Sequence, residues 1–110
     1  MLVEERRSPQ LLRGVLDMCL LALIAEAECY GYEMVSKLEA RGLHLVSEGS
    51  IYPILSRLLR AGLIESFLVP SSEGPPRKYY RVLPKGRAAL GGWVGEWQAF
   101  ARSVDRVVER

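Results

Sequence analysis

Apolar residues follow helical patterns through the first half of the chain. Between residues 10 and 26 they fall on nearly every side of a helix, so that helix must be covered on all sides. One side is expected to meet the core of its own domain and another to meet a partner chain. Asp17 interrupts the run, either at a partly solvated interface or as a polar group in a ligand pocket. A second helical pattern runs from residue 32 to 41, and Gly42 predicts its end.

The third helical pattern has one apolar face and clear end signals. Ser47 is a good N-cap, Ser50 is a competing one, and Gly62 predicts the end of the helix. With Ser47 as the cap, Pro53 falls in the second turn, where its ring opposes the carbonyl of Gly49, a residue free to adjust. The apolar face comprises Ile51, Ile54, Leu55, Leu58 and Leu59.

Two strand-forming segments follow this helix. Residues 63–69 are rich in strand formers, residues 70–76 have the composition of a loop, and residues 78–83 return as a second strand. The two strands are expected to pair as a hairpin. Tyr79 and Tyr80 point to opposite faces of the second strand, so one of them is expected to enter the core.

A last helix is predicted from Pro84 onward, because proline favours the first turn of a helix. Its apolar residues recur at spacings of three and four, the pattern of a coiled-coil seam: Leu90, Trp93, Trp97, Phe100, Val104 and Val107. We expect this seam to join two subunits, the alternative being a helix that packs on its own domain. Gly91, Gly95 and Ala99 form a row beside the indoles, where either a partner helix approaches closely or a cavity opens.

Composition and charge sharpen this pattern. A chain of 110 residues is expected to form one domain, and a hydrophobic content of 49% favours some apolar surface for a second subunit. The formal net charge is only +2, but residues 77–87 contain five basic side chains and no acidic one. Such a local cluster favours nucleic-acid binding more than the total charge does.

Other classes of function lack support in the sequence. The only histidine, His44, has no nucleophile or carboxylate pair near it, and no Cys/His metal spacing or phosphate-binding glycine motif occurs. We therefore expect no enzyme, cofactor or metal. Cys19 is expected to behave as a small buried hydrophobe. The apolar run 18–25 begins too late and is too short for a signal peptide or a membrane span, which predicts a cytoplasmic protein without a membrane partner.

The order helix, helix, helix, hairpin, helix predicts a mainly α fold with a small β-hairpin, a winged helix-turn-helix with a C-terminal dimerisation helix. The sequence resembles the PadR family of bacterial transcriptional regulators, in its small-subfamily form. The matching segments are LRG at 12–14, GYE at 31–33, SEGSIYP at 47–53, RL at 57–58, GLI at 62–64, PRKYYR at 76–81 and PKGR at 84–87. Tyr30 lies where the family often has histidine. The expected parts are a flexible arm at 1–9, a DNA-binding domain at 10–83 and a dimerisation helix at 84–110.

In a helix-turn-helix, the second helix directs its N-terminal part at the bases of the major groove. Arginine bonds the guanine edge, whereas hydroxyl groups more often bond phosphate oxygens. The candidates on this helix are Ser47, Ser50, Tyr52, Pro53, Ser56, Arg57 and Arg60. Ser47 is equally interpretable as a cap alone, and Arg60 as a phosphate contact or a solvated charge. Lys37, on the preceding helix, is a further phosphate candidate.

The predicted hairpin, which is the wing of the winged helix-turn-helix, and the dimer complete this interpretation. Arg77 and Lys78 are expected to project from the tip of the wing toward the DNA backbone or minor groove. Arg81 is either a phosphate contact or a surface charge. A palindromic operator on double-stranded DNA requires a homodimer, with recognition helices about 34–36 Å apart. Leu12 and Leu16 of the first helix, together with the seam of the last helix, are the expected dimer contacts.

The resemblance also implies an effector site. In some small PadR-like regulators a flat hydrophobic effector lies between the subunits near paired aromatic residues of the last helix. Trp97 and Trp93 match that region, and Val15 and Asp17 are expected to line it. Indoles favour flat aromatic molecules and Asp17 favours cations, while the alternative is a dry aromatic core. The predicted function is a repressor released by such an effector. The alternative function is a winged-helix protein-interaction module, although interaction surfaces tend to be depleted in Lys.

Overall fold

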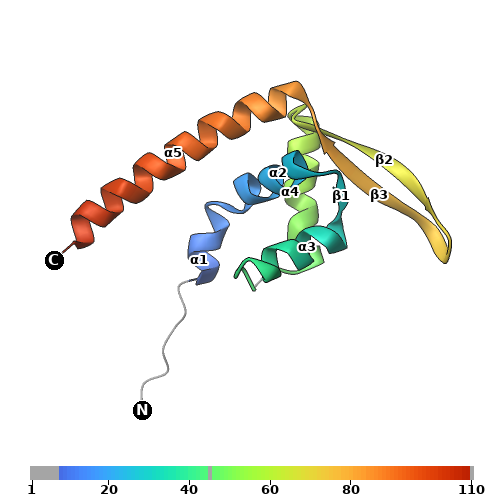
Figure 1. Ribbon diagram of the computed structural model, residues 1–110, viewed down its shortest axis with the longest axis horizontal. Helices are drawn as coiled ribbons and strands as arrows, with labels where there is room; N and C mark the ends of the chain where they lie inside the picture. Colours follow the sequence, from blue (N-terminus) through green and yellow to red (C-terminus); the bar gives the residue numbers. More distant parts are fainter. Residues whose placement is uncertain (1–7, 45, 110) are drawn as a thin grey trace, which may run out of the picture.

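The computed structural model describes residues 8–44 and 46–109, which form five helices and a small antiparallel sheet that projects to one side of them (Figure 1). The elements are α1 Ser8–Arg13, α2 Leu16–Glu26, β1 Cys29–Tyr30, α3 Gly31–Ala40, α4 Glu48–Arg60, β2 Ile64–Ser71, β3 Gly74–Val82 and α5 Pro84–Val108. The predicted fold class, mainly helical with a small β-hairpin and a long C-terminal helix, is confirmed. No helix of the described residues is long and apolar enough to cross a membrane.

The core lies between α2, α3, α4 and the inner face of the sheet. Helix α2 contributes Leu20, Leu21, Leu23 and Ile24, all of them buried. Tyr80 is the tyrosine of β3 that enters this core, as the alternation across the strand predicted. Each fully buried Leu or Ile side chain contributes roughly 1.5–3 kcal/mol. Helix α2 contacts β3 as well as α3, α4 and α5, so it joins the sheet to these helices.

The helix expected over residues 10–26 is two helices, which corrects the sequence prediction. The chain turns at Gly14 and Val15, whose N–H groups bond the carbonyls of Leu11 and Leu12, at 3.3 and 3.0 Å. A glycine inside a helix costs about 1 kcal/mol relative to alanine, which favours a break at Gly14. Helix α1 begins at Ser8, within the arm expected at 1–9, and residues 1–7 of that arm lie outside the described residues.

The end signals of α4 act as predicted. Ser47 has extended backbone angles and is the N-cap, whereas Ser50 is the third residue of the helix and not a competing cap. The Ser47 N–H donates to Ser50 Oγ at 3.2 Å, and the Ser50 hydroxyl donates to the Ser47 carbonyl at 2.8 Å. Gly62 ends the helix with a φ of +74°, a backbone conformation that costs glycine little. Both ends of α4 are thus fixed by local contacts.

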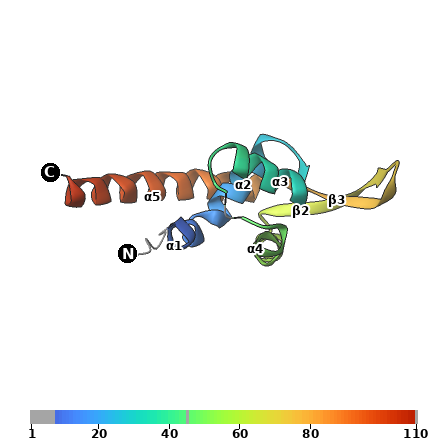
Figure 2. The same ribbon diagram turned by 90° about the horizontal axis from the view of Figure 1, so that it is seen from below.

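The sheet is larger than the predicted hairpin. Its strand order is β1-β3-β2, and the short strand β1 pairs with β3 through Cys29↔Tyr80 and Tyr30↔Tyr79. The expected loop at 70–76 is mostly strand, because Ser71 pairs with Gly74 and only two residues turn between them. Prolines are tolerated there because each strand has a single partner in that part of the sheet. The hairpin consequently extends well beyond the helices (Figure 2).

Candidate nucleic-acid interface

Helix α4 separates an apolar face from a polar one. Ile51, Leu55 and Leu58 are buried against the core. The candidate residues predicted from the sequence are all exposed on the other sides of the helix or at its N-cap: Ser47, Ser50, Tyr52, Pro53, Ser56, Arg57 and Arg60. Their spacing places Pro53, Arg57 and Arg60 along one line, since residues three and four apart are neighbours on a helix. All three residues of this line are exposed, and Figure 2 shows α4 at one side of the helical body.

Tyr52 is more constrained than a simple surface residue. Its hydroxyl donates to Glu48 Oε2 at 3.2 Å, and burial together with this bond raises the pKa of the phenol. A Cβ added to Gly31 would lie 2.9 Å from the same hydroxyl oxygen, so Tyr52 packs closely over the first residue of α3. Tyr52 therefore fixes the relation between α3 and α4 besides reaching the surface. The carboxylate of Glu48 on this face is a feature that the sequence reasoning missed.

Lys37, the candidate on α3, lies near carboxylates. Arg41 donates two hydrogen bonds of 2.8 Å to Glu26, and this bond is the main reason why the pKa of Glu26 is lowered. The charge of Lys37 contributes to the same lowering, so Lys37 lies within Coulombic reach of Glu26 at the end of α2. Lys37 is half-buried and has a carboxylate within Coulombic reach.

The wing places its two predicted basic residues on opposite faces. Because side chains alternate along a strand, Lys78 lies on the inner face of the sheet, the same face as the buried Tyr80, and Arg77 lies on the outer face. Both are within β3, opposite Leu68 and Val69, and not at a loop tip as the sequence suggested. The reason is the length of β3, which begins three residues before Arg77. Arg77 Nη1 donates to the Tyr30 hydroxyl at 3.1 Å, and its guanidinium carbon lies 4.8 Å from the ring centroid.

The basic cluster at residues 77–87 is divided by its contacts. Arg81 Nε lies 3.5 Å from Glu28 Oε2 and 3.4 Å from Glu65 Oε1, and its guanidinium stacks 4.1 Å above the Phe67 ring. Of the two interpretations left open for Arg81, these contacts favour a balanced surface charge. Lys85 donates to the carbonyl of Ala61 at 2.8 Å, at the C-terminal end of α4, where a positive charge is favourable. Two of the cluster's charges are thus bound within the chain.

Aromatic rings line the outer face of the sheet beside Arg77. The Tyr30 ring centroid lies 6.5 Å from that of Tyr32 and 5.2 Å from that of Tyr79, and the Tyr79 and Phe67 centroids lie 5.9 Å apart. Tyr30 was assigned no role from the sequence, because the family often has histidine at that position. The signal that points to it is the pair Cys29-Tyr30, which alternates between buried and half-buried like Tyr80-Tyr79 on its partner strand.

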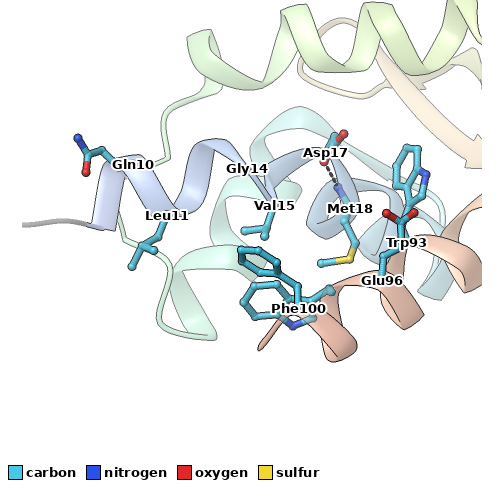
Figure 3. A pocket seen from close by; sticks show the side chains of 10 residues that line it. Gln10, Leu11, Gly14, Val15, Asp17, Met18, Trp93, Glu96 and Phe100 are labelled. Carbon is cyan, nitrogen blue, oxygen red and sulfur yellow. Dashed lines mark hydrogen bonds between the residues drawn. The ribbon is translucent and has the colours of Figure 1, made fainter. Parts of the chain in front are cut away.

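A hollow of about 620 Å³ lies between α5 and the first two helices (Figure 3). It brings together Val15, Asp17, Trp93 and Trp97, the four residues expected to line an effector site. The other lining residues, which were not predicted as effector contacts, are Gln10, Leu11, Gly14, Met18, Glu96 and Phe100. The Asp17 carboxylate accepts the Met18 N–H at 2.7 Å. Within the described residues, no group of three or more His, Cys, Asp or Glu side chains is placed to hold a metal ion.

The predicted seam of α5 changes character along the helix. Leu90 and Trp93 are partly buried against the chain's own core. At these two positions the helix packs on its own domain, which was the alternative to an intersubunit seam. Further along, the exposed fractions are 44% for Trp97, 65% for Phe100, 41% for Val104 and 84% for Val107. Leu16, an expected dimer contact, is buried in the core, and Leu12 is half-buried against it. Among the expected dimer contacts, the exposed ones therefore lie on the second half of α5.

Comparison with known proteins identifies the family. Residues 20–92 match the model of the Transcriptional regulator PadR-like family. The chain belongs to this family. A PadR-like transcriptional regulator from Bacillus cereus has a similar structure, with a TM-score of 0.81 and 42% identity over 92% of this chain and 98% of that one. A transcriptional regulator from Mycobacterium tuberculosis is 36% identical over 71% of this chain and 71% of its own length.

A further similar structure is that of PadR from Bacillus subtilis, which was solved in complex with operator DNA. It has a TM-score of 0.66 and 26% identity, over 73% of this chain and 46% of that one. The present protein is a PadR-family transcriptional regulator with a winged-helix fold. The matched residues 20–92 span most of α2, the helix-turn-helix, the wing and the start of α5. Trp93, Glu96 and Trp97, which line the hollow, lie beyond that match.

Proposed function

We propose that the protein is a cytoplasmic transcriptional repressor that binds a palindromic operator as a homodimer, and that it acts as a binding protein and not as an enzyme. The observation that carries this proposal is the exposed polar face of α4. Arg57 and Arg60 lie there, and the ion pairs found among the described residues belong to Arg41 and Arg81 instead. The charges of Arg57 and Arg60 are thus available to a polyanion. The operator complex of the relative from Bacillus subtilis supports DNA as the partner.

The roles of the interface residues follow from their side chains. Arg57, one turn into the exposed line of α4, is assigned to a guanine edge, where a bidentate contact discriminates by about 1–3 kcal/mol. Ser50, Ser56 and Arg60 are assigned to phosphates. On the wing, Arg77 and Lys78 are assigned to the backbone or the minor groove, from the two faces of β3. Phosphate contacts fix the register of the protein, and base contacts specify the sequence.

The second half of α5 is assigned to dimerisation. Its apolar residues are exposed in the single chain, and a second copy would cover them through the same seam on both subunits. The two α4 helices would then lie about 34–36 Å apart, in successive major grooves on one side of the duplex. A protein that uses the winged helix only for protein contacts is the second candidate, and DNA binding distinguishes the two.

The hollow is assigned to a small planar effector. A volume near 620 Å³ falls within the range of about 300–1,000 Å³ that is typical of small-molecule sites. Trp93, Trp97 and Phe100 offer ring faces for stacking, while Asp17 and Glu96 favour a cation. Because the hollow borders the dimerisation helix, an effector that prefers one arrangement of the subunits would alter the spacing of the two DNA-binding heads. A dry aromatic core is the alternative.

A gel-shift titration with DNA from upstream of the protein's own gene tests the proposal. The expected result is a discrete complex that weakens steeply as salt rises and withstands a moderate excess of unrelated duplex, because specific sites are typically preferred by 10³-fold or more. Failure to form any complex at low salt would instead favour the protein-interaction candidate.

A further inference from the structure

The guanidinium of Arg77 is held at a defined place on the outer face of the wing. It donates one hydrogen bond of 3.1 Å to the Tyr30 hydroxyl and lies 4.8 Å from the centre of that ring. An arginine carries five N–H donors, so this bond leaves the others available. The two residues are 47 positions apart in the chain, and the pairing of β1 with β3 brings them together.

Tyr30 is itself fixed from three sides. It lies in β1, opposite Tyr79 of β3. Its N–H donates to Glu33 Oε1 at 3.1 Å, within the first turn of α3. Its ring packs between those of Tyr32 and Tyr79. The hydroxyl is therefore a stationary acceptor, attached to the helix-turn-helix and directed at the wing.

The charge of Arg77 remains uncompensated among the described residues. Arg81, which lies four residues further along β3 on the same face, is placed between the carboxylates of Glu28 and Glu65. Arg77 has a neutral hydroxyl and an aromatic ring as its partners instead. These partners orient a guanidinium without neutralising it, which suits a group that must still attract a phosphate.

We propose that Tyr30 is a positioning residue for DNA binding, whose hydroxyl holds the Arg77 guanidinium in the pose that meets the DNA backbone beside the wing. This inference rests on the DNA-binding function proposed above. A free arginine side chain loses rotamer freedom when it binds, and a side chain ordered beforehand loses less. Tyr30 contributes affinity through Arg77, not through a DNA contact of its own.

The test is a double-mutant cycle with Tyr30→Phe and Arg77→Ala. Phenylalanine keeps the ring stack and removes only the acceptor oxygen. Fluorescence anisotropy would measure binding to a labelled duplex from the protein's own promoter region and to a mixed-sequence duplex. Tyr30→Phe is expected to weaken both about 3- to 10-fold, the effect of ordering one long side chain. The same change made in the Arg77→Ala protein is expected to have no further effect.

Salt titrations and a matched control complete the test. Arg77→Ala should reduce the slope of log affinity against log salt by about one, whereas Tyr30→Phe should leave it unchanged because no charge is lost. Tyr32→Phe removes a neighbouring hydroxyl of the same aromatic row and should leave affinity unchanged. Equal losses from Tyr30→Phe with and without Arg77 would overturn the positioning role, as would no loss at all.

The outcomes also separate this inference from the function on which it rests. If Arg77→Ala weakens binding and Tyr30→Phe does not, the inference fails while DNA binding stands. If the unaltered protein binds neither duplex, both fail.

Discussion

At the scale of single residues, the surroundings of each arginine decide what it can offer to DNA. Arg81 lies between Glu28 and Glu65, and a phosphate would have to compete with both carboxylates for its guanidinium. Arg57 projects from α4 with no ion pair among the described residues. Both belong to a chain with a net charge of only +2, so the local environment distinguishes them and the total charge does not.

Arg57→Ala tests this difference. We expect a loss of about 1–3 kcal/mol in specific binding, and relaxed preference at one base pair, because a bidentate contact to guanine is removed. Anisotropy titrations against the promoter duplex and its single-base variants measure both effects. Arg102→Ala, which removes the same charge from an exposed position on α5, is the control and should change affinity little. An equal loss on every duplex would mean that Arg57 contacts only the backbone.

At the scale of elements, the features that sequence predicted are those that depend on neighbouring residues. Ser47 and Gly62 define α4 because a cap bonds within its own turn and a positive φ is a property of glycine itself. Strand β1 was missed because two residues carry no period, and its identity depends on Tyr79 and Tyr80, some 50 positions away. The contact of Arg77 with Tyr30 is invisible to local patterns for the same reason. The four predicted residues of the hollow, Val15, Asp17, Trp93 and Trp97, were named because the resemblance to the PadR family implies an effector site there, whereas nothing in the sequence singled out Glu96.

The junction between α4 and α5 gives an element-scale prediction. Gly86, in the first turn of α5, is buried, and an added Cβ would overlap the carbonyl oxygen of Leu63. That oxygen already accepts the Leu83 N–H at 2.9 Å, so neither group can move freely. Gly86→Ala is expected to destabilise the protein by about 1–3 kcal/mol, the usual effect of overpacking. Thermal unfolding would report this as a fall in Tm.

Gly92→Ala is the matched control for Gly86→Ala. Gly92 lies in the same helix, is exposed, and an added Cβ there would meet nothing within 4 Å. Alanine should stabilise the helix at that position by up to about 1 kcal/mol. Opposite signs for the two substitutions would show that close approach to Leu63, and not helix propensity, dictates glycine at position 86. A rise in Tm for Gly86→Ala would contradict the packing argument.

At the scale of the whole molecule, the wing and α5 leave the helical body on different sides (Figures 1 and 2). The hairpin extends from the core past α3, while the second half of α5 passes over α1 and the hollow. Helix α2 contacts α4, the sheet and α5. It therefore connects α4 and the wing, the proposed DNA-binding elements, with α5, the proposed dimerisation helix. In the proposed dimer, a change in the angle of α5 on α2 would therefore move the DNA-binding head of the second subunit relative to that of the first.

Dimerisation through α5 is tested by Val104→Asp. Val104 lies on the exposed seam and does not line the hollow, so a charge there should separate the subunits without altering the hollow of each chain. Light scattering at micromolar concentration should give twice the mass of one chain for the unaltered protein and the mass of one chain for the variant. Ser103→Asp adds the same charge off the seam and should remain dimeric. A monomeric unaltered protein would contradict the proposed dimer.

The hollow gives the last prediction, since a pocket and a dry core respond differently to planar dyes. Stacking against Trp93 and Trp97 should quench their fluorescence, and Trp97→Ala should abolish most of the quenching because a ring face is lost. Asp17→Asn should weaken the binding of a cationic dye about 3- to 10-fold, because the Coulombic attraction is removed. The binding of a neutral dye of the same shape should be unaffected. If neither dye quenches the fluorescence of the unaltered protein, the result contradicts the proposed planar-ligand pocket and favours a dry aromatic core.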